Sequence, residues 1–171
     1  MSTEPERRRK KVAAGRPASK RKRKSKPVIG WREWVALPDL GVDAIKVKID
    51  TGARSSSLHA FEIETFERDG IEMVRFVLHP KQRRRQAVGP MEAPLHIKKL
   101  VRNPGGREEI RPVIRTQVVW NGVAFEVDLN LTRRDEMGFR MLLGRQAVRR
   151  RFLVDPGRSF LGTTPEDKEQ A

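Results

Sequence analysis

The chain has 171 residues, enough for one domain, and 37% of them are hydrophobic, so it can bury one modest core. It contains no Cys, which excludes disulfide bonds and thiolate zinc sites. No apolar run approaches the roughly 20 residues of a membrane helix, and the basic N-terminus lacks a secretory signal, so we expect a soluble, cytoplasmic protein.

The first segment, residues 1–27, is strongly basic. Residues 1–26 hold twelve Lys and Arg against two Glu, a net charge of +10, which leaves +5 of the total +15 for the other residues. Such a segment has too little apolar surface to fold, so we expect a disordered tail. It is either an electrostatic arm for nucleic acid or the ribosome, or a solubilising extension. We expect one folded domain over 28–162 and a flexible tail over 163–171.

The middle of the chain is typical of β-structure. Ile45, Val47 and Ile49 alternate with lysines, the period of a half-buried strand, and this strand runs directly into Asp50. Residues 58–66 and 71–78 flank a turn at 68–70, and residues 113–120 and 123–131 flank Asn121-Gly122. Another turn lies at 103–106, and a short helix is predicted at 145–150. Closely spaced short strands predict an all-β, closed barrel.

Asp50-Thr51-Gly52 is the candidate catalytic motif. Alone the triplet is weak, because many proteins contain it by chance. Its context adds weight, since Asp50 ends a strand, Gly52 permits a tight or positive-φ turn, and the Thr51 hydroxyl can help to fix that turn. A carboxylate placed in this way is exposed yet held rigidly.

A second segment lies far downstream, where an apolar run ends in Leu143-Gly144-Arg145 and leads into the short helix. The two segments together resemble retropepsins, which have an Asp-Thr-Gly-Ala motif followed much later by two apolar residues, Gly, Arg and a helix. The resemblance implies that Leu143 and Gly144 pack beside the catalytic loop, which continues through Ala53 and Arg54. It also implies that Arg145 braces a dimer through a carboxylate whose identity the sequence leaves open.

A closer resemblance covers about residues 31–162. The chain is similar to a bacterial family labelled ATP-dependent zinc protease, or RimK/LysX-associated, whose domain is classed as a retropepsin-like aspartic protease. The family name refers to RimK-type ATP-grasp ligases, which add glutamates to a protein C-terminus. No glycine-rich phosphate loop supports ATP binding. The matching segments are 31–35, 46–60, 111–116, 131–145 and 152–160.

The resemblance implies peptide hydrolysis by two carboxylates that share one proton. The chain holds one Asp-Thr-Gly, because the Asp39 and Asp155 triplets lack the hydroxyl residue, so a homodimer with one Asp50 from each subunit is expected. No cofactor or metal is expected.

Retropepsins also close a Gly-rich hairpin flap over the substrate. The corresponding stretch here includes residues 81–85 and Gly89-Pro90 and is Arg-rich instead. Arg83, Arg84 and Arg85 suggest an acidic substrate, such as the glutamate tails made by a RimK-type ligase. A solvated surface charge run is the alternative interpretation of these arginines.

Three other functions remain open. A zinc protease would have to use His59, His79 or His96, although none lies in a metalloprotease motif, and His59 is close enough to Asp50 to share a site. A non-enzymatic module would bind RNA or the ribosome through its basic segments. Aromatic residues are only 6% of the chain, however, so base-stacking surfaces are scarce. A partner of an ATP-grasp ligase is the third.

Overall fold

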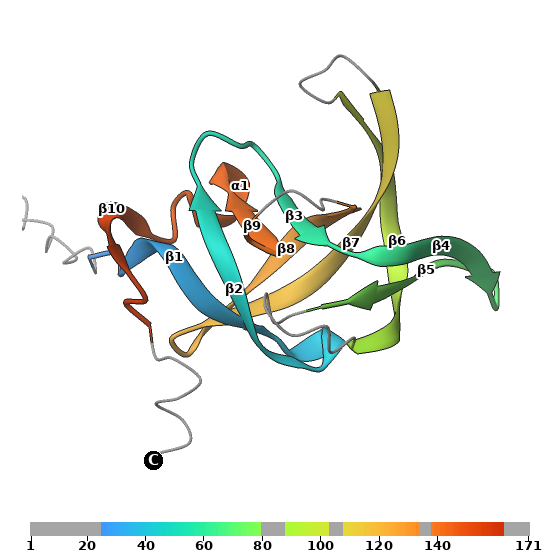
Figure 1. The fold of residues 1–171 in the computed structure, drawn as a ribbon, viewed down its shortest axis with the longest axis horizontal. Coiled ribbons are helices and arrows are strands. Elements are labelled where there is room, and N and C mark those ends of the chain that lie inside the picture. Colours follow the sequence, from blue (N-terminus) through green and yellow to red (C-terminus); the bar gives the residue numbers. More distant parts are fainter. Residues whose placement is uncertain (1–24, 80–87, 103–107, 134–137, 163–171) are drawn as a thin grey trace, which may run out of the picture.

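The computed structural model describes residues 25–79, 88–102, 108–133 and 138–162 (Figure 1). Within these residues no helix is long and apolar enough to cross a membrane. The described chain is almost entirely β-structure. Its elements are β1 (Val28–Leu37), a 3-10 helix (Pro38–Leu40), β2 (Val42–Asp50), β3 (Ser56–His59), β4 (Phe61–Arg68), β5 (Ile71–Leu78), β6 (Val88–Arg102), β7 (Glu108–Trp120), β8 (Val123–Thr132), β9 (Met141–Gly144), α1 (Arg145–Val148) and β10 (Leu153–Ser159).

Six strands close into a barrel in the order β1-β2-β9-β3-β8-β7, and β7 returns to β1 where Val119 pairs with Ala36. Strand β10 lies outside the barrel, parallel to β1, while β6, β5 and β4 continue the sheet beyond β7. The all-β barrel with one short helix is therefore confirmed. The two tails lie outside the described residues, so their disorder and the domain limits stay predictions.

The predicted hairpins are present with altered boundaries. Asn121 and Gly122 have φ angles of 46° and 75°, the left-handed conformation that a two-residue primed turn requires, and they join β7 to β8. The first hairpin is split at Ala60, because β3 pairs with β8 and β9 whereas β4 pairs with β5. The turn at 103–106 lies outside the described residues.

The position of β2 in the barrel follows from the alternation of apolar and polar side chains along it. Ile45, Val47 and Ile49 point into the barrel and are at most 6% exposed. There they join fully buried side chains from β8 and β9, among them Leu129 and Leu143. Because side chains alternate across a strand, burial of these three fixes the register of β2 and leaves Asp50 at its end, out of the core.

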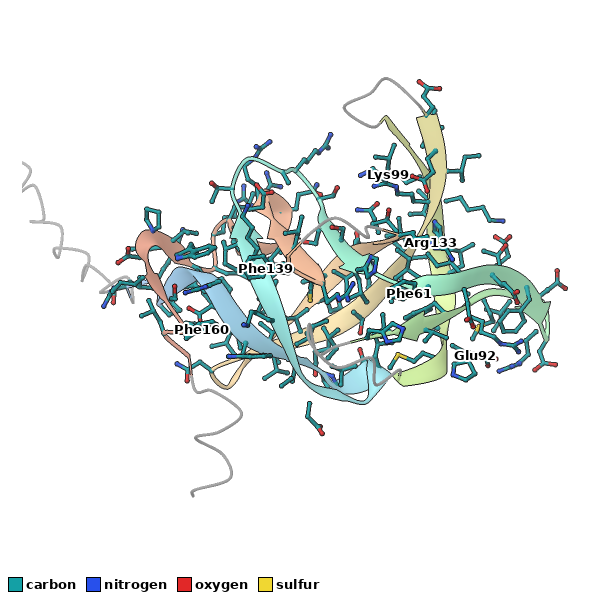
Figure 2. All side chains as sticks on the ribbon, viewed as in Figure 1. Phe61, Glu92, Lys99, Arg133, Phe139 and Phe160 are labelled. Carbon is teal, nitrogen blue, oxygen red and sulfur yellow. The ribbon has the colours of Figure 1, made fainter. Side chains whose placement is uncertain are left out.

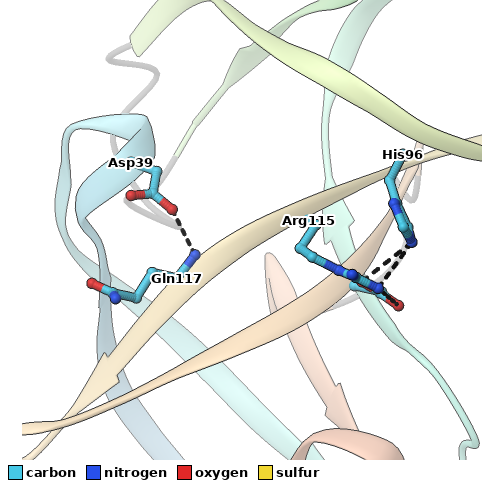
Figure 3. Close-up of polar contacts among 5 residues, drawn as sticks. Asp39, His96, Arg115 and Gln117 are labelled. Carbon is cyan, nitrogen blue, oxygen red and sulfur yellow. Dashed lines mark hydrogen bonds and ion pairs between the residues drawn. The ribbon is translucent and has the colours of Figure 1, made fainter.

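Asp39 ties the connection between β1 and β2 to strand β7 (Figure 3). Its Oδ2 accepts hydrogen bonds from the Gln117 backbone N–H at 2.7 Å and from the Thr116 hydroxyl at 3.2 Å. This Asp-x-Gly triplet therefore has a structural role, as its lack of a hydroxyl residue suggested.

Glu33 in β1 is a buried carboxylate that sequence reasoning missed. It is fully inaccessible, and it accepts hydrogen bonds from three backbone N–H groups: Gly30 at 2.7 Å, Leu161 at 3.0 Å and Gly162 at 3.1 Å. The last two lie after β10, so Glu33 fastens the end of the described chain to β1. A buried charge is tolerable here because each of these amide dipoles points at it.

Replacing Glu33 should destabilise the fold. In Glu33→Gln the side-chain NH2 group faces an N–H donor, and we expect a loss of about 1–3 kcal/mol in the free energy of unfolding. Glu33→Ala leaves three N–H donors without an acceptor and should lower the free energy of unfolding further. Urea unfolding measures both, with Glu67→Gln on the exposed face of β4 as a control expected to stay within about 0.5 kcal/mol. Equal stabilities for Glu33→Gln and the control would contradict this role.

Candidate active site

Asp50 is the last residue of β2, and its carboxylate folds back onto the loop that follows. Oδ1 accepts hydrogen bonds from the backbone N–H groups of Gly52 at 3.1 Å and Ala53 at 3.0 Å. Within the described residues Oδ2 accepts none. One oxygen is thus fixed by two amides, and the other is left for water or substrate.

Gly52 matters because of space rather than φ. Its φ is not positive, contrary to one of the two reasons expected for a glycine there. A Cβ at Gly52 would lie 3.3 Å from Asp50 Oδ1, so any side chain would press against the carboxylate oxygen. Thr51 is exposed, and no hydrogen bond of its hydroxyl is found among the described residues. The turn is held by other groups.

Strand β9 supplies the floor of this loop. It runs parallel to β2, so that Leu143 pairs with Ile49 and Gly144 with Asp50. A Cβ on Gly144 would overlap the backbone of Ser55, and the Gly144 N–H donates to the Ser56 hydroxyl at 3.1 Å. The two segments that the sequence singled out are therefore neighbours, and the second must contain a glycine at this point.

Arg145 and the first turn of α1 hold the loop from the other side. The Arg145 guanidinium donates to the carbonyls of Thr51 at 3.1 Å and Gly52 at 2.7 Å. The backbone N–H groups of Arg145 and Gln146 donate to the next two carbonyls, those of Ala53 at 2.8 Å and Arg54 at 3.1 Å. Four successive carbonyls of the loop thus have partners. Among the described residues of one chain Arg145 binds carbonyl groups, and its contact with a carboxylate across a dimer stays a prediction.

The other predicted residues lie in different surroundings. Arg54 is exposed, four positions after Asp50. Arg83, Arg84 and Arg85 lie outside the described residues, so their role stays a prediction.

Gly89 and Pro90 are the second and third residues of β6, directly after its connection to the antiparallel strand β5, so the predicted flap position stays a prediction. They fall at a shift of register, between the pairs that Met91 makes with Phe76 and Val88 with Leu78. Strand β6 is long and joins two neighbours: its first half pairs with β5 and its second with β7.

The histidines do not gather around Asp50. His59 ends β3, which starts beside Gly144 and runs away from it, and its ring packs on Phe61 at 4.5 Å. The Phe61 ring also contacts the His79 ring, with centroids 4.7 Å apart, whereas His96 lies on β6 beside Arg115 (Figure 3). In the part of the chain that the structure describes, no group of three or more His, Asp or Glu could hold a metal. The zinc alternative gains no support.

Asp155, in the third Asp-x-Gly triplet, is also engaged elsewhere. Its carboxylate accepts hydrogen bonds from the Arg158 guanidinium at 2.8 Å and the Gly157 N–H at 2.9 Å. These two contacts, the guanidinium first, lower the pKa of Asp155. Neither Asp39 nor Asp155 is thus free to act with Asp50.

A model of the RimB-like family, described as retropepsin-like aspartic endopeptidase RimB, matches residues 28–165. The chain belongs to this RimB-like family. The match spans the barrel, the Asp50 loop and the β9–α1 segment that supports it.

Similar proteins differ in length and in name. Two curated relatives are each named "probable alpha-L-glutamate ligase". The one from Desulfotalea psychrophila is 45% identical over 132 residues, covering 77% of this chain and 28% of the relative. The one from Parasynechococcus marenigrum is 46% identical over 147 residues, covering 85% and 32%. The chain therefore spans about a third or less of these relatives.

A solved structure has the same fold. The crystal structure of Lpg0085 from Legionella pneumophila, a protein described as of unknown function (DUF785), has a TM-score of 0.65 and 30% sequence identity, covering 80% of this chain and 98% of that one.

Gly144→Ala should disrupt the loop. The new Cβ collides with the Ser55 backbone, which cannot move without shifting Asp50, so we expect a loss of about 1–3 kcal/mol or more in unfolding free energy. Gly138→Ala is the matched control, since a Cβ at that position meets nothing within 4 Å. Thermal unfolding of the two variants measures the difference, and a Gly144→Ala variant as stable as the control would refute the close approach.

Proposed function

We propose that this chain is an aspartic peptidase that works as a homodimer, with Asp50 of each subunit facing the same water molecule. The observation that carries the proposal is the Asp50 carboxylate at the end of β2, held by two loop amides through one oxygen only. Membership of a family described as retropepsin-like aspartic endopeptidases supports it.

The chemistry needs two carboxylates and no cofactor. Two neighbouring carboxyl groups share one proton because both cannot ionise together. The ionised group takes a proton from water as the water oxygen attacks the peptide carbonyl carbon, and the protonated group donates to the carbonyl oxygen. The C–N bond then breaks, and the leaving nitrogen takes up a proton. One chain supplies one carboxylate, and a two-fold axis supplies the second.

The β6–β7 hairpin is the better candidate for a flap over the substrate. It lies between the Asp50 strand and β8 in chain order, its strands have 15 and 13 residues, and it projects from the barrel in Figure 1. Its outermost described pairs include Leu100 and Ile110, which are 59% and 67% exposed. The sequence between the two strands includes Gly105-Gly106, which lies outside the described residues.

The substrate that we propose is a glutamate-rich peptide, such as the tail that a RimK-type ligase would make. Arg54, exposed within the loop that follows Asp50, is a cation beside the proposed cleavage point. The names of the relatives support the link, since they refer to glutamate ligation and this domain matches only a third or less of each of those proteins. The ligase itself is a proposed partner, and a cytoplasmic location also stays a proposal.

Asp50→Asn should abolish peptide hydrolysis. The amide cannot act as a base, so kcat/KM should fall by about 10²–10⁴-fold or more while thermal stability is retained. Asp43→Asn, an exposed residue of the same strand, is the control and should keep full activity. Full activity of Asp50→Asn would refute the proposal.

Mixing the two chains tests the shared site. If the chains exchange freely, an equal mixture of wild type and Asp50→Asn contains about a quarter wild-type dimers, and activity should fall to that fraction of the same total chain. A monomeric enzyme would keep half, so the two mechanisms give different values in one titration.

Charge should decide substrate preference. We expect faster cleavage of a glutamate-rich peptide than of a neutral one of equal length, and Arg54→Gln should lower only the former, by about tenfold. Arg149→Gln is the control: Arg149 is exposed and directly follows α1. Equal rates for both peptides with the wild type would argue against an acidic substrate while leaving the catalytic proposal intact.

A further inference from the structure

The outer face of β1 and β2 gathers aromatic rings and cations from three parts of the chain. We call this surface the β1–β2 strip; it consists of Trp31, Arg32, Trp34, Lys46, Lys48 and Phe160. Across the two strands Arg32 pairs with Lys48 and Trp34 with Lys46. The Phe160 N–H donates to the Arg32 carbonyl at 2.9 Å, and this hydrogen bond holds the Phe160 ring beside β1. All six side chains are partly exposed.

The rings hold the cations in place. The Arg32 guanidinium lies 4.7 Å from the centre of the Trp31 ring and 5.1 Å from that of Phe160, and its Nε donates to the Ser159 hydroxyl. The Lys46 ammonium lies 5.1 Å from the Trp34 ring and 5.6 Å from Phe160. Cation–π contacts of this kind order side chains that would otherwise be mobile, so an anion bound there loses less conformational entropy.

The charge of the strip is uncompensated. Over the described residues Arg32, Lys46 and Lys48 form no ion pair with a carboxylate. Cations elsewhere do: Arg115 binds Asp128 at 2.7 Å and Lys98 binds Glu72 at 2.6 Å. Glu33, the carboxylate within β1, faces backbone amides instead. The strip therefore presents three positive charges, two of them ordered by aromatic rings, to whatever binds it.

We propose that the β1–β2 strip binds single-stranded nucleic acid, with phosphates on Arg32, Lys46 and Lys48 and bases against the exposed parts of Trp31 and Trp34. Single-stranded nucleic acids offer both a chain of phosphates and flat rings, the two chemistries that this surface combines. An acidic peptide would neutralise the cations but make no use of the rings. Figure 2 shows Phe160 on the β1–β2 side of the molecule, away from the β4–β5 hairpin.

Chain continuity adds to this argument. Strand β1 begins at Val28, and the preceding 26 residues carry a net charge of +10. The basic segment, whose charge attracts polyanions of any sequence, therefore directly precedes the strand that carries half of the strip. The same end of the strip leads to the candidate active site, because Lys48 pairs with Arg32 near the start of β1 and is two residues before Asp50 on the same face of β2. A glutamate-rich peptide is for that reason the competing occupant.

Fluorescence anisotropy of the full chain with a labelled single-stranded RNA of about 20 nucleotides, over a range of salt concentrations, tests the proposal. Lys46→Ala/Lys48→Ala should weaken binding at least about tenfold and reduce the salt slope by about 1.4, or 0.7 for each lost phosphate contact. Lys98→Ala/Lys99→Ala removes the same charge from β6 and should bind like wild type. Trp34→Leu should lower the affinity for the single-stranded RNA about tenfold but leave the affinity for an RNA duplex of equal length unchanged.

Several outcomes would overturn the proposal. Equal affinity and slope for the two double variants would assign all binding to residues outside the strip. A glutamate-rich peptide whose affinity depends on Lys46 and Lys48, with RNA affinity unchanged, would make the strip a peptide surface. Dissociation of a dimer by the Lys46/Lys48 variant in sedimentation, again with RNA affinity unchanged, would make it a subunit interface. Asp50→Asn should keep RNA binding, so this test and that of the peptidase fail independently.

Discussion

The parallel pairing of β2 with β9 decides the geometry around Asp50. It sets Asp50 opposite Gly144, and the missing side chain there lets the Ser55 backbone cross β9 at a distance that no other residue would allow. The loop between β2 and β3 has no regular structure, so its carbonyls need partners from elsewhere. Arg145 and Gln146 bind four of these carbonyls, two through the Arg145 guanidinium and two through backbone N–H groups. One turn of helix thereby fixes the loop that presents the Asp50 carboxylate.

Charge is distributed unevenly over the described fold. On β6 and β8 two carboxylates have arginine partners: the pKa of Glu92 is lowered by Arg75 and Arg68, and that of Asp128 by Arg115. On β1 and β2 two outward cations, Arg32 and Lys46, have aromatic rings for neighbours instead. The candidate active site therefore stands beside a surface with a net positive charge, which agrees with a polyanionic ligand, whether a peptide tail or a nucleic acid.

Local patterns in the sequence carried the prediction of the barrel and of the candidate motif. The alternation at Ile45, Val47 and Ile49 predicted β2, because burial of alternate residues is a property of one strand by itself. Asn121-Gly122 predicted the β7–β8 turn, since these residue types tolerate positive φ. Sequence patterns did not predict β6, whose halves pair with different neighbours and whose outer residues lack a single alternation.

The sequence by itself thus determined the fold class, the strand that ends at Asp50 and the two segments that form the candidate site. Only the tertiary structure decided which carbonyl groups Arg145 binds, that a Cβ at Gly52 would crowd the Asp50 carboxylate, and that backbone amides after β10 bind Glu33. It also brought Phe139 and Phe160 against Trp31 and Trp34 of β1, although the scarcity of aromatic residues had argued against a stacking surface. These contacts join residues up to about 130 positions apart, and their existence depends on strand register, which local periodicity does not specify.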